Sequence, residues 1–239
     1  MEEVVQHTAY DWSKDIIIPL TGAILIPVAI AFFTWWFGAS RAEKQKELEK
    51  LRDNLNLLIS MIGTNIVLLL KYRNAILTII RDYKVANTNM DTSKIFHTIL
   101  YDDSLRNIDC TKYANCIQYS ENFVGNLIEI QNLSTQIEFL NSNRTSSLKT
   151  ILEHENNEYR SLRLLDFLKD QDDSLQDSLN LVDLCIIKSG KFLEEIKSLE
   201  KKVKKLKLDR IACDVSSLFE QIKQEYNQRN EKSEKEPNK

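Results

Sequence analysis

The sequence HENNE, residues 154–158, is the part of the chain that comes closest to a metal-binding helix. In a zinc helix, two histidines four residues apart lie on one face, where both rings can bind the metal. Here the second position holds Glu158 instead, and the other two histidines are remote in the sequence. The ExxH pairs that a helical di-iron site needs are absent as well. The sequence therefore predicts no metal site.

A reactive thiol is the second chemistry that the residue types allow. His97 precedes Cys110 and Cys116, and a histidine beside a cysteine can activate it as a nucleophile. We favour the alternative, a loop histidine with small apolar thiols. Phosphate-binding loops need clustered glycines, and neither GxxxxGK nor GxGxxG occurs. We therefore expect no catalytic residue, no cofactor, no small-molecule substrate and no enzymatic activity.

The most distinctive charge feature is KKVKKLKLDR, which places six basic residues within ten positions. Such a cluster can bind anionic lipid headgroups or nucleic-acid phosphates. A solvated outer helix face is the alternative, because Val203 and Leu206 continue an apolar heptad through it. The net charge of −3 gives no general argument for nucleic acid, so we do not expect it as a partner. The basic residues of this lysine-rich cluster are Lys201, Lys202, Lys204, Lys205, Lys207 and Arg210.

The chain contains few residues that break helices, and this predicts which secondary structure carries the side chains described above. The 239 residues include only three prolines and five glycines. Tight turns between strands draw on both residue types, so the composition predicts an all-α protein of long helices and few loops. The four cysteines form no CxxC pair, which is typical of reduced thiols in a cytoplasmic compartment.

An uncharged stretch of 23 residues, numbered 16–38, lies near the amino terminus. As a helix it would extend roughly 34 Å, enough to cross a hydrocarbon core of about 30 Å. Trp12, Trp35 and Trp36 fall near its two ends, where indole rings anchor in membrane interfaces. A cleaved signal peptide is the alternative, but the preceding segment is acidic rather than basic. We predict a transmembrane helix over 16–38 in a lipid bilayer.

The distribution of basic residues predicts the direction of this span. Lys14 alone precedes it, and a larger number follows it closely. Positive charges stay in the cytoplasm, which places residues 1–15 outside as a short tail and the larger remainder inside. We expect a bacterial inner membrane or an equivalent one. The basic residues that follow the span are Arg41, Lys44, Lys46, Lys50 and Arg52.

Pro27 lies in the middle of the predicted span. It removes one backbone donor and leaves the carbonyl of Ala23 without its helical partner, so we expect a kink. The functional interpretation is a hinge. The alternative is simple tolerance, because neighbouring groups in membrane proteins satisfy the freed carbonyl.

A heptad pattern follows the span and predicts a long helix that packs against several others. Asn65 is its only amide, and it either sets register or oligomeric state or lies at the edge of the seam. A second span over 54–70 is the alternative, but its amides and hydroxyls would be costly in hydrocarbon, so we favour an amphipathic cytoplasmic helix. The seam residues are Leu48, Leu51, Leu55, Leu58, Ile62, Asn65, Leu69, Tyr72, Ile76, Ile79 and Tyr83.

Three more long helices are expected, over 112–141, 147–169 and 174–228. The polar sequences NSNRTSS and DQDDSLQ should separate them, and a slip in the heptad after Leu206 should change the supercoil without ending the last helix. Residues 39–228 would then form a cytoplasmic bundle or antiparallel coiled coil of four or five helices. The polar tail, residues 229–239, should be disordered.

These features favour a non-enzymatic, membrane-anchored scaffold, or a signalling or assembly subunit, that binds another protein or a second copy through its helix seams. Two alternatives stay open. The first is a membrane-acting effector of the phage-exclusion, antiviral-defence or toxin type, in which assembly of the body drives the kinked span to perturb the inner membrane. The second is a lipid- or nucleic-acid-binding module that uses the lysine-rich cluster.

Overall fold

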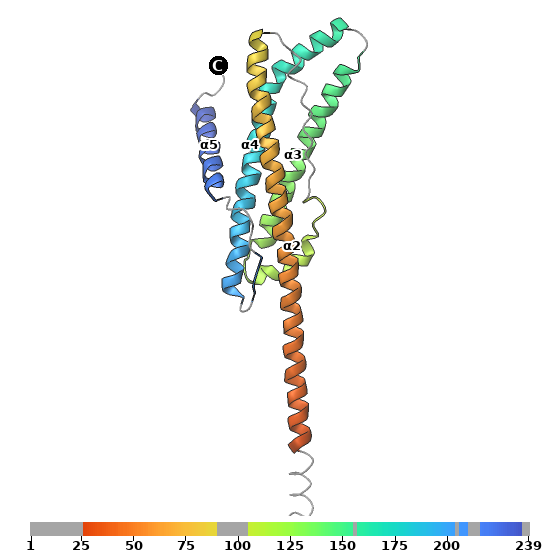
Figure 1. The fold of residues 1–239 in the computed structure, drawn as a ribbon, viewed down its shortest axis with the longest axis vertical. Coiled ribbons are helices and arrows are strands. Elements are labelled where there is room, and N and C mark those ends of the chain that lie inside the picture. The colour runs from red at the N-terminus through yellow and green to blue at the C-terminus, as the bar shows by residue number, and fades with distance from the viewer. Residues whose placement is uncertain (1–25, 90–104, 155–156, 204–205, 210–215, 236–239) are drawn as a thin grey trace, which may run out of the picture. The chain divides into compact units, whose positions relative to one another are not determined.

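The computed structural model describes residues 26–89, 105–154, 157–203, 206–209 and 216–235 (Figure 1). These residues are helical apart from short turns and connections, and no β-strand occurs among them, so the predicted all-α class is confirmed for this part of the chain. The chain divides into two compact units, residues 1–51 and 52–239. The elements are α2 (Ile26–Asn89), the 3₁₀ helix η4 (Cys110–Gln118), α3 (Phe123–Leu152), α4 (Asn157–Lys202) and α5 (Ser216–Lys235).

Helix α2 is a single helix of 64 residues that contributes to both units. In the second unit its heptad faces the interior, as predicted, while Ser60 and Thr64 on the opposite side are exposed. Residues 54–70 thus form a helix with one buried and one exposed face. The buried seam residues are Leu55, Leu58, Ile62, Asn65, Leu69, Tyr72, Ile76 and Ile79.

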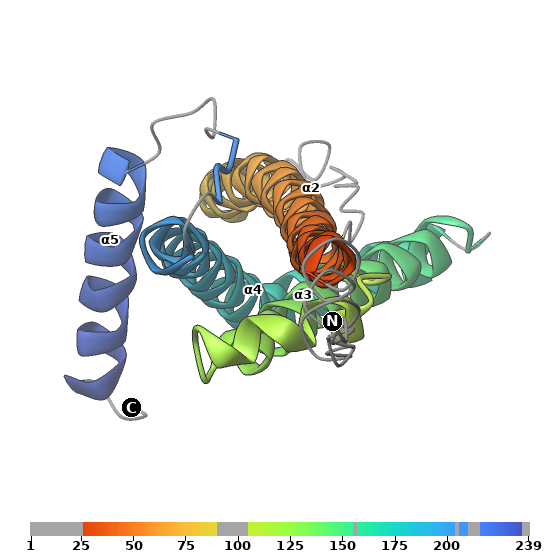
Figure 2. The same cartoon turned by 90° about the horizontal axis from the view of Figure 1, so that it is seen from below.

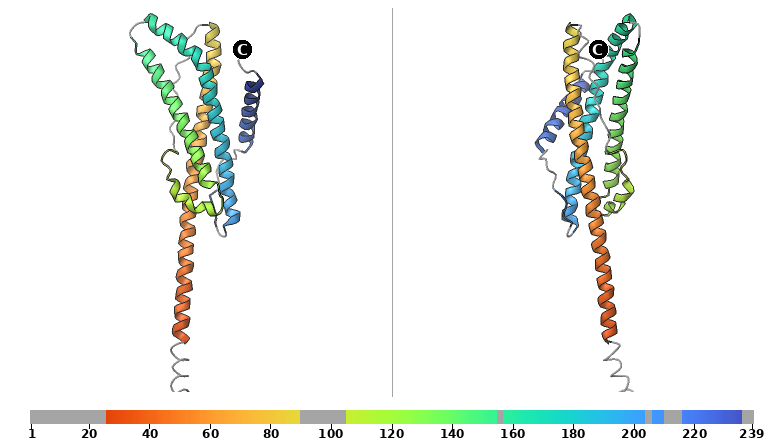
Figure 3. Two further views of the ribbon diagram at one scale, coloured as in Figure 1. Left: turned by 180° about the vertical axis from the view of Figure 1, so that it is seen from behind. Right: turned by 45° about the vertical axis from the view of Figure 1, so that its right-hand side comes forward.

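Helix α4 lies at the centre of the second unit and runs antiparallel to α3 and α5 (Figures 1 and 3). An aromatic cluster joins the start of α3 to α4. The ring of Phe123 lies 4.8 Å from that of Phe192 and 6.5 Å from that of Tyr113 in η4, measured between centroids. The carboxylate of Glu195 accepts a hydrogen bond of 2.8 Å from Asn126 and another from Ser120. These contacts fix the start of α3 against α4.

Two predicted breaks are wrong, because NSNRTSS lies inside α3 and DQDDSLQ lies inside α4. Serine and asparagine cost only about 0.5–0.7 kcal/mol each relative to alanine in a helix, and neither sequence contains glycine or proline. The buried side chains of Ile137 and Leu148 give α3 packing contacts on both sides of the predicted break. Tertiary packing therefore outweighs the local preference for a loop.

The predicted helix over 174–228 is two helices, because α4 ends at Lys202 and α5 begins at Ser216. Residues 206–209 between them are not helical. Val203 and Leu206 are both buried, and the helix ends before the heptad slip that follows Leu206. The amino group of Lys202 donates to the carbonyl of Tyr119 over 2.7 Å, which fixes this end to η4.

The tail predicted to be disordered is helical as far as the structure describes it, since α5 extends to Lys235. Helix α5 lies beside α4 (Figure 2). Ile222 provides its buried contact and is 1% exposed. A polar sequence can therefore continue a helix when one face is anchored by burial and by ion pairs.

Gly190 marks a close approach of α4 and α5, because a Cβ atom there would lie 3.1 Å from the ring of Phe219. We expect Gly190→Leu to overpack this contact, to lower the free energy of unfolding by about 1–3 kcal/mol and to remove hydrogen-exchange protection from α5. Gly125→Leu is the matched control, since that helical glycine meets no atom within 4 Å. Equal protection of α5 in both variants would contradict the role of this contact.

Candidate functional site

The first candidate site is the apolar segment of α2 that lies in the first unit. Its large apolar side chains are all more than half exposed, whereas most apolar seam residues of the same helix beyond residue 54 are buried. Within the described residues, α2 has the length and composition to cross a membrane, but its most apolar 18-residue stretch is 44% buried and therefore lies beyond this exposed segment. The exposed residues are Ile26, Val28, Ile30, Phe32, Phe33, Trp35, Trp36 and Phe37.

The predicted anchors and hinge fall partly within this segment. Trp35 and Trp36 are 66% and 57% exposed, and the indole of Trp36 stacks on the ring of Phe32 with centroids 6.1 Å apart. Pro27 is the second residue of α2 and is exposed. The turn before it, including Ala23, lies outside the described residues, as does Trp12.

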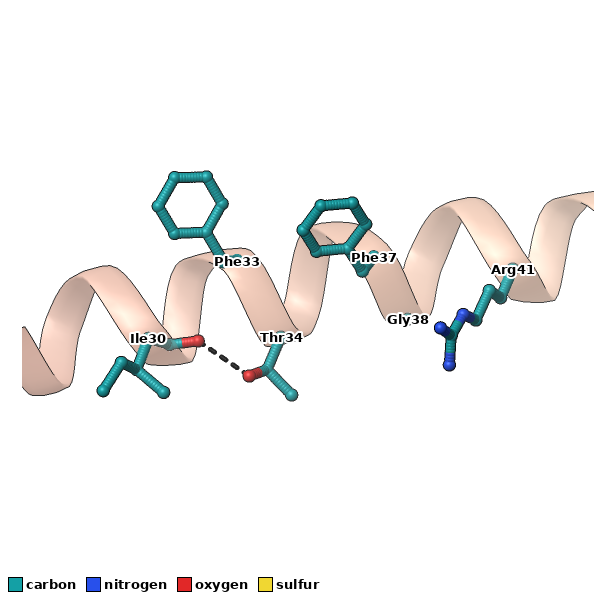
Figure 4. Close-up of a pocket in the computed structure, with 6 residues that line it drawn as sticks. All are labelled: Ile30, Phe33, Thr34, Phe37, Gly38 and Arg41. Atoms are coloured by element: carbon teal, nitrogen blue, oxygen red, sulfur yellow. Dashed lines mark hydrogen bonds between the residues drawn. The ribbon is translucent and has the colours of Figure 1, made fainter.

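One side of this segment carries an open groove of about 490 Å³ (Figure 4). The hydroxyl of Thr34 donates to the carbonyl of Ile30 over 2.7 Å, so it is satisfied within its own helix. The rings of Phe33 and Phe37 stack with centroids 6.3 Å apart. The groove residues are Ile30, Phe33, Thr34, Phe37, Gly38 and Arg41.

The second candidate site is an ionic cluster built around Asp183, a fully buried carboxylate on α4. Its Oδ1 accepts a hydrogen bond of 2.6 Å from Nε of Arg73 on α2, and its Oδ2 accepts from the guanidinium of Arg229 on α5. Arg73 also donates to the carboxylate of Glu225 on α5. A single carboxylate thus connects three helices. We call these four residues the Asp183 cluster.

Two members of the Asp183 cluster, Arg73 and Glu225, are held in their charged forms. Burial of the Arg73 guanidinium opposes its charge, but the hydrogen bonds and charges of Asp183 and Glu225 outweigh this and raise the pKa of Arg73. Desolvation likewise opposes ionisation of Glu225, yet hydrogen bonds from Gln221 and Arg73 keep its pKa below the usual value. Arg73 and Glu225 are therefore both charged near neutral pH.

Sequence reasoning missed the Asp183 cluster, although a signal was present. Asp183 is the only charged residue in the apolar sequence LNLVDLCII, residues 179–187. A charge within an apolar helical run is rarely tolerated unless it is paired. What the sequence does not reveal is the partner, since Arg73 lies 110 positions away.

Asn65 is completely buried in the seam and does not lie at its edge. Tyr72 lies about two turns beyond it on α2, and burial raises the pKa of its hydroxyl to about 12 against the opposing charge of Arg144. Arg144 belongs to the sequence predicted as a break in α3. Continuation of α3 thus brings a basic residue close to the seam of α2.

The lysine-rich cluster is only partly described. Lys201, Lys202 and Lys207 are exposed, and Lys204, Lys205 and Arg210 lie outside the described residues. Val203 and Leu206 are buried among them. The cluster covers the end of α4 and the connection after it rather than one helix face.

The residues that suggested thiol or metal chemistry are not assembled into a site within the described part of the chain. Burial raises the pKa of Cys116 to about 11, and Cys110 lies with its sulfur 3.1 Å from Oε1 of Gln131. His154 stacks against Tyr159 with ring centroids 4.2 Å apart. No group of three His, Cys, Asp or Glu residues among the described ones could hold a metal ion. His97 lies outside them.

Comparison of the chain with protein-family models, with curated proteins and with solved structures gave no match. The apolar segment, its groove and the Asp183 cluster are therefore interpreted from their own geometry.

Proposed function

We propose that the chain is a non-enzymatic, single-pass membrane protein whose helical portion lies in the cytoplasm and binds a partner protein, as a scaffold or as a signalling or assembly subunit. The main support for this proposal is the change in the exposure of apolar side chains along α2. Val28 is 59% exposed and Trp35 66% exposed, whereas Leu58 and Ile62 are fully buried. Helix packing accounts for the burial of Leu58 and Ile62. A lipid environment accounts for the exposure of Val28 and Trp35, because a contiguous apolar surface of this size is unfavourable in water.

The outward face of α3 supports the second half of the proposal, partner binding. Phe139 is 63% exposed and Ile128 is 43% exposed, three turns apart on one side of the helix. Apart from Glu129 and Lys149, most exposed residues between and beyond them carry amides or hydroxyls: Asn132, Thr135, Gln136, Ser142, Asn143, Ser146 and Ser147.

Two charged residues beside this α3 outer face are paired: Glu129 with Lys188 over 3.0 Å and Glu138 with Arg106 over 3.4 Å. A solvated helix face normally carries many charges. Protein interfaces, by contrast, are poor in charge at their centres and rich in aromatic side chains. The α3 outer face therefore has the composition of a docking surface centred on Phe139.

A photo-crosslinking residue at position 139 tests this function in intact cells. We expect it to form an adduct of one discrete mass with a protein, and a reporter fused after Lys239 to be active only in the cytoplasm. Position 149 is the control, because Lys149 is on the same helix with its side chain 73% exposed and paired only with Glu153. The proposal fails if position 139 gives no more adduct than position 149, or if the reporter is active outside.

A further inference from the structure

The groove on α2 combines a long apolar floor with a single cation at one end. Figure 4 shows the rings of Phe33 and Phe37 on one side of the helix and the guanidinium of Arg41 extending back toward Gly38. Gly38 has no atom within 4 Å of the position that a Cβ would occupy, so its missing side chain leaves the hollow open. Since the hydroxyl of Thr34 is satisfied by Ile30, the floor presents carbon to an occupant.

Arg41 is exposed and makes no ion pair with any residue that the structure describes. From Ile30 to Arg41 the helix rises about 16 Å, which equals the thickness of one leaflet of hydrocarbon, about 15 Å. An occupant that matches this groove has an acyl chain of one leaflet's length and an anionic group at its end.

We propose that the groove binds an anionic glycerophospholipid, with its phosphate on the guanidinium of Arg41 and one acyl chain along Phe33, Phe37 and Gly38. This inference rests on the proposed membrane location. Guanidinium binds phosphate through paired hydrogen bonds, which are stronger when both groups are charged. Lys44, one turn beyond Arg41 on the same side of the helix, adds a second positive charge near the headgroup.

A second copy of the chain fits the groove less well than a lipid. Two copies inserted in the same direction would bring Arg41 against Arg41 at the end of the contact, and like charges at an interface oppose association. The phosphate of an anionic lipid neutralises the same charge. The groove therefore favours the lipid as its occupant.

Native mass spectrometry of the full chain, released from nanodiscs with equal amounts of phosphatidylglycerol and phosphatidylcholine, tests the inference. The phosphate of phosphatidylcholine is already paired with its own choline cation. We expect about a fivefold excess of phosphatidylglycerol among the bound lipids. Arg41→Gln should reduce the ratio to about one, whereas Lys46→Gln, which removes the same charge from the far side of the helix, should leave it unchanged. Gly38→Leu should displace the bound lipid by filling the groove, and the adjacent Ala39→Leu should not.

The outcomes separate this inference from the proposed function. A chain that enters the nanodiscs but binds both lipids equally, or an Arg41→Gln variant with the same ratio as Lys46→Gln, overturns the lipid site alone. A dimer that carries no lipid assigns the groove to a second copy and overturns it as well. A chain that does not enter the nanodiscs overturns both the lipid site and the membrane location.

Discussion

Replacing Asp183 with alanine is expected to lower the free energy of unfolding by about 3–5 kcal/mol, because it leaves buried guanidinium charge without its main partner. Arg73 and Arg229 both bond to this carboxylate, and their side chains are only 9% and 24% exposed. Urea unfolding of the full chain in detergent, followed by circular dichroism, measures the change. Hydrogen exchange should show the largest loss of protection in α5, which is attached to α4 through Arg229.

Two comparisons show whether this loss comes from the ion pairs. Asp177→Ala removes an exposed carboxylate from the same helix and should change the free energy of unfolding by no more than about 0.5 kcal/mol. The double variant Arg73→Met with Asp183→Leu replaces the buried pair by apolar side chains and should recover much of the lost stability. If Asp183→Ala unfolds at the same urea concentration as Asp177→Ala, the Asp183 cluster does not stabilise the fold.

Placing aspartate at both Val28 and Ile30 is expected to abolish stable membrane insertion. Each carboxylate near the centre of a span costs about 3 kcal/mol, so the two together cost about 6 kcal/mol. Carbonate extraction followed by sedimentation should find the wild-type chain in the membrane pellet. The double variant should be found in the soluble or degraded fraction instead.

The matched control places aspartate at Leu57 and Val67, which are exposed apolar residues of the same helix in the second unit. Leu57 is 57% exposed and Val28 is 59% exposed, so burial within the chain does not distinguish the two positions. Only contact with lipid does. The control variant should remain in the membrane pellet. Equal behaviour of the two double variants, or a wild-type chain that is soluble without detergent, would contradict the span.

The elements that could be predicted are those whose pattern depends on local spacing. The heptad of α2 was predicted correctly because apolar residues at steps of three and four can face a core only as a helix. The breaks in α3 and α4 were predicted wrongly because polar composition is a weak signal. Leu148 is buried beyond the polar sequence NSNRTSS, and this long-range contact keeps α3 helical through it.

The candidate sites also differ in whether the sequence alone predicts them. The apolar segment before residue 38 is visible in the sequence because length and composition alone identify a candidate membrane span. The Asp183 cluster is not, because it depends on residues from three helices that meet only in the fold. The groove at Gly38 and Arg41 lies between these cases. Its residues follow helical spacing, but only the structure identifies the hollow and the satisfied hydroxyl of Thr34.

The position of Arg229 near the carboxyl end has a consequence for biosynthesis. Asp183 leaves the ribosome 46 residues before this partner, so a growing chain holds a buried carboxylate with only Arg73 to neutralise it. Chains that stop before α5 lack Arg229 and Glu225 and cannot complete the Asp183 cluster. Since cellular proteases remove proteins that open readily, incomplete translation products should be degraded faster than the finished protein.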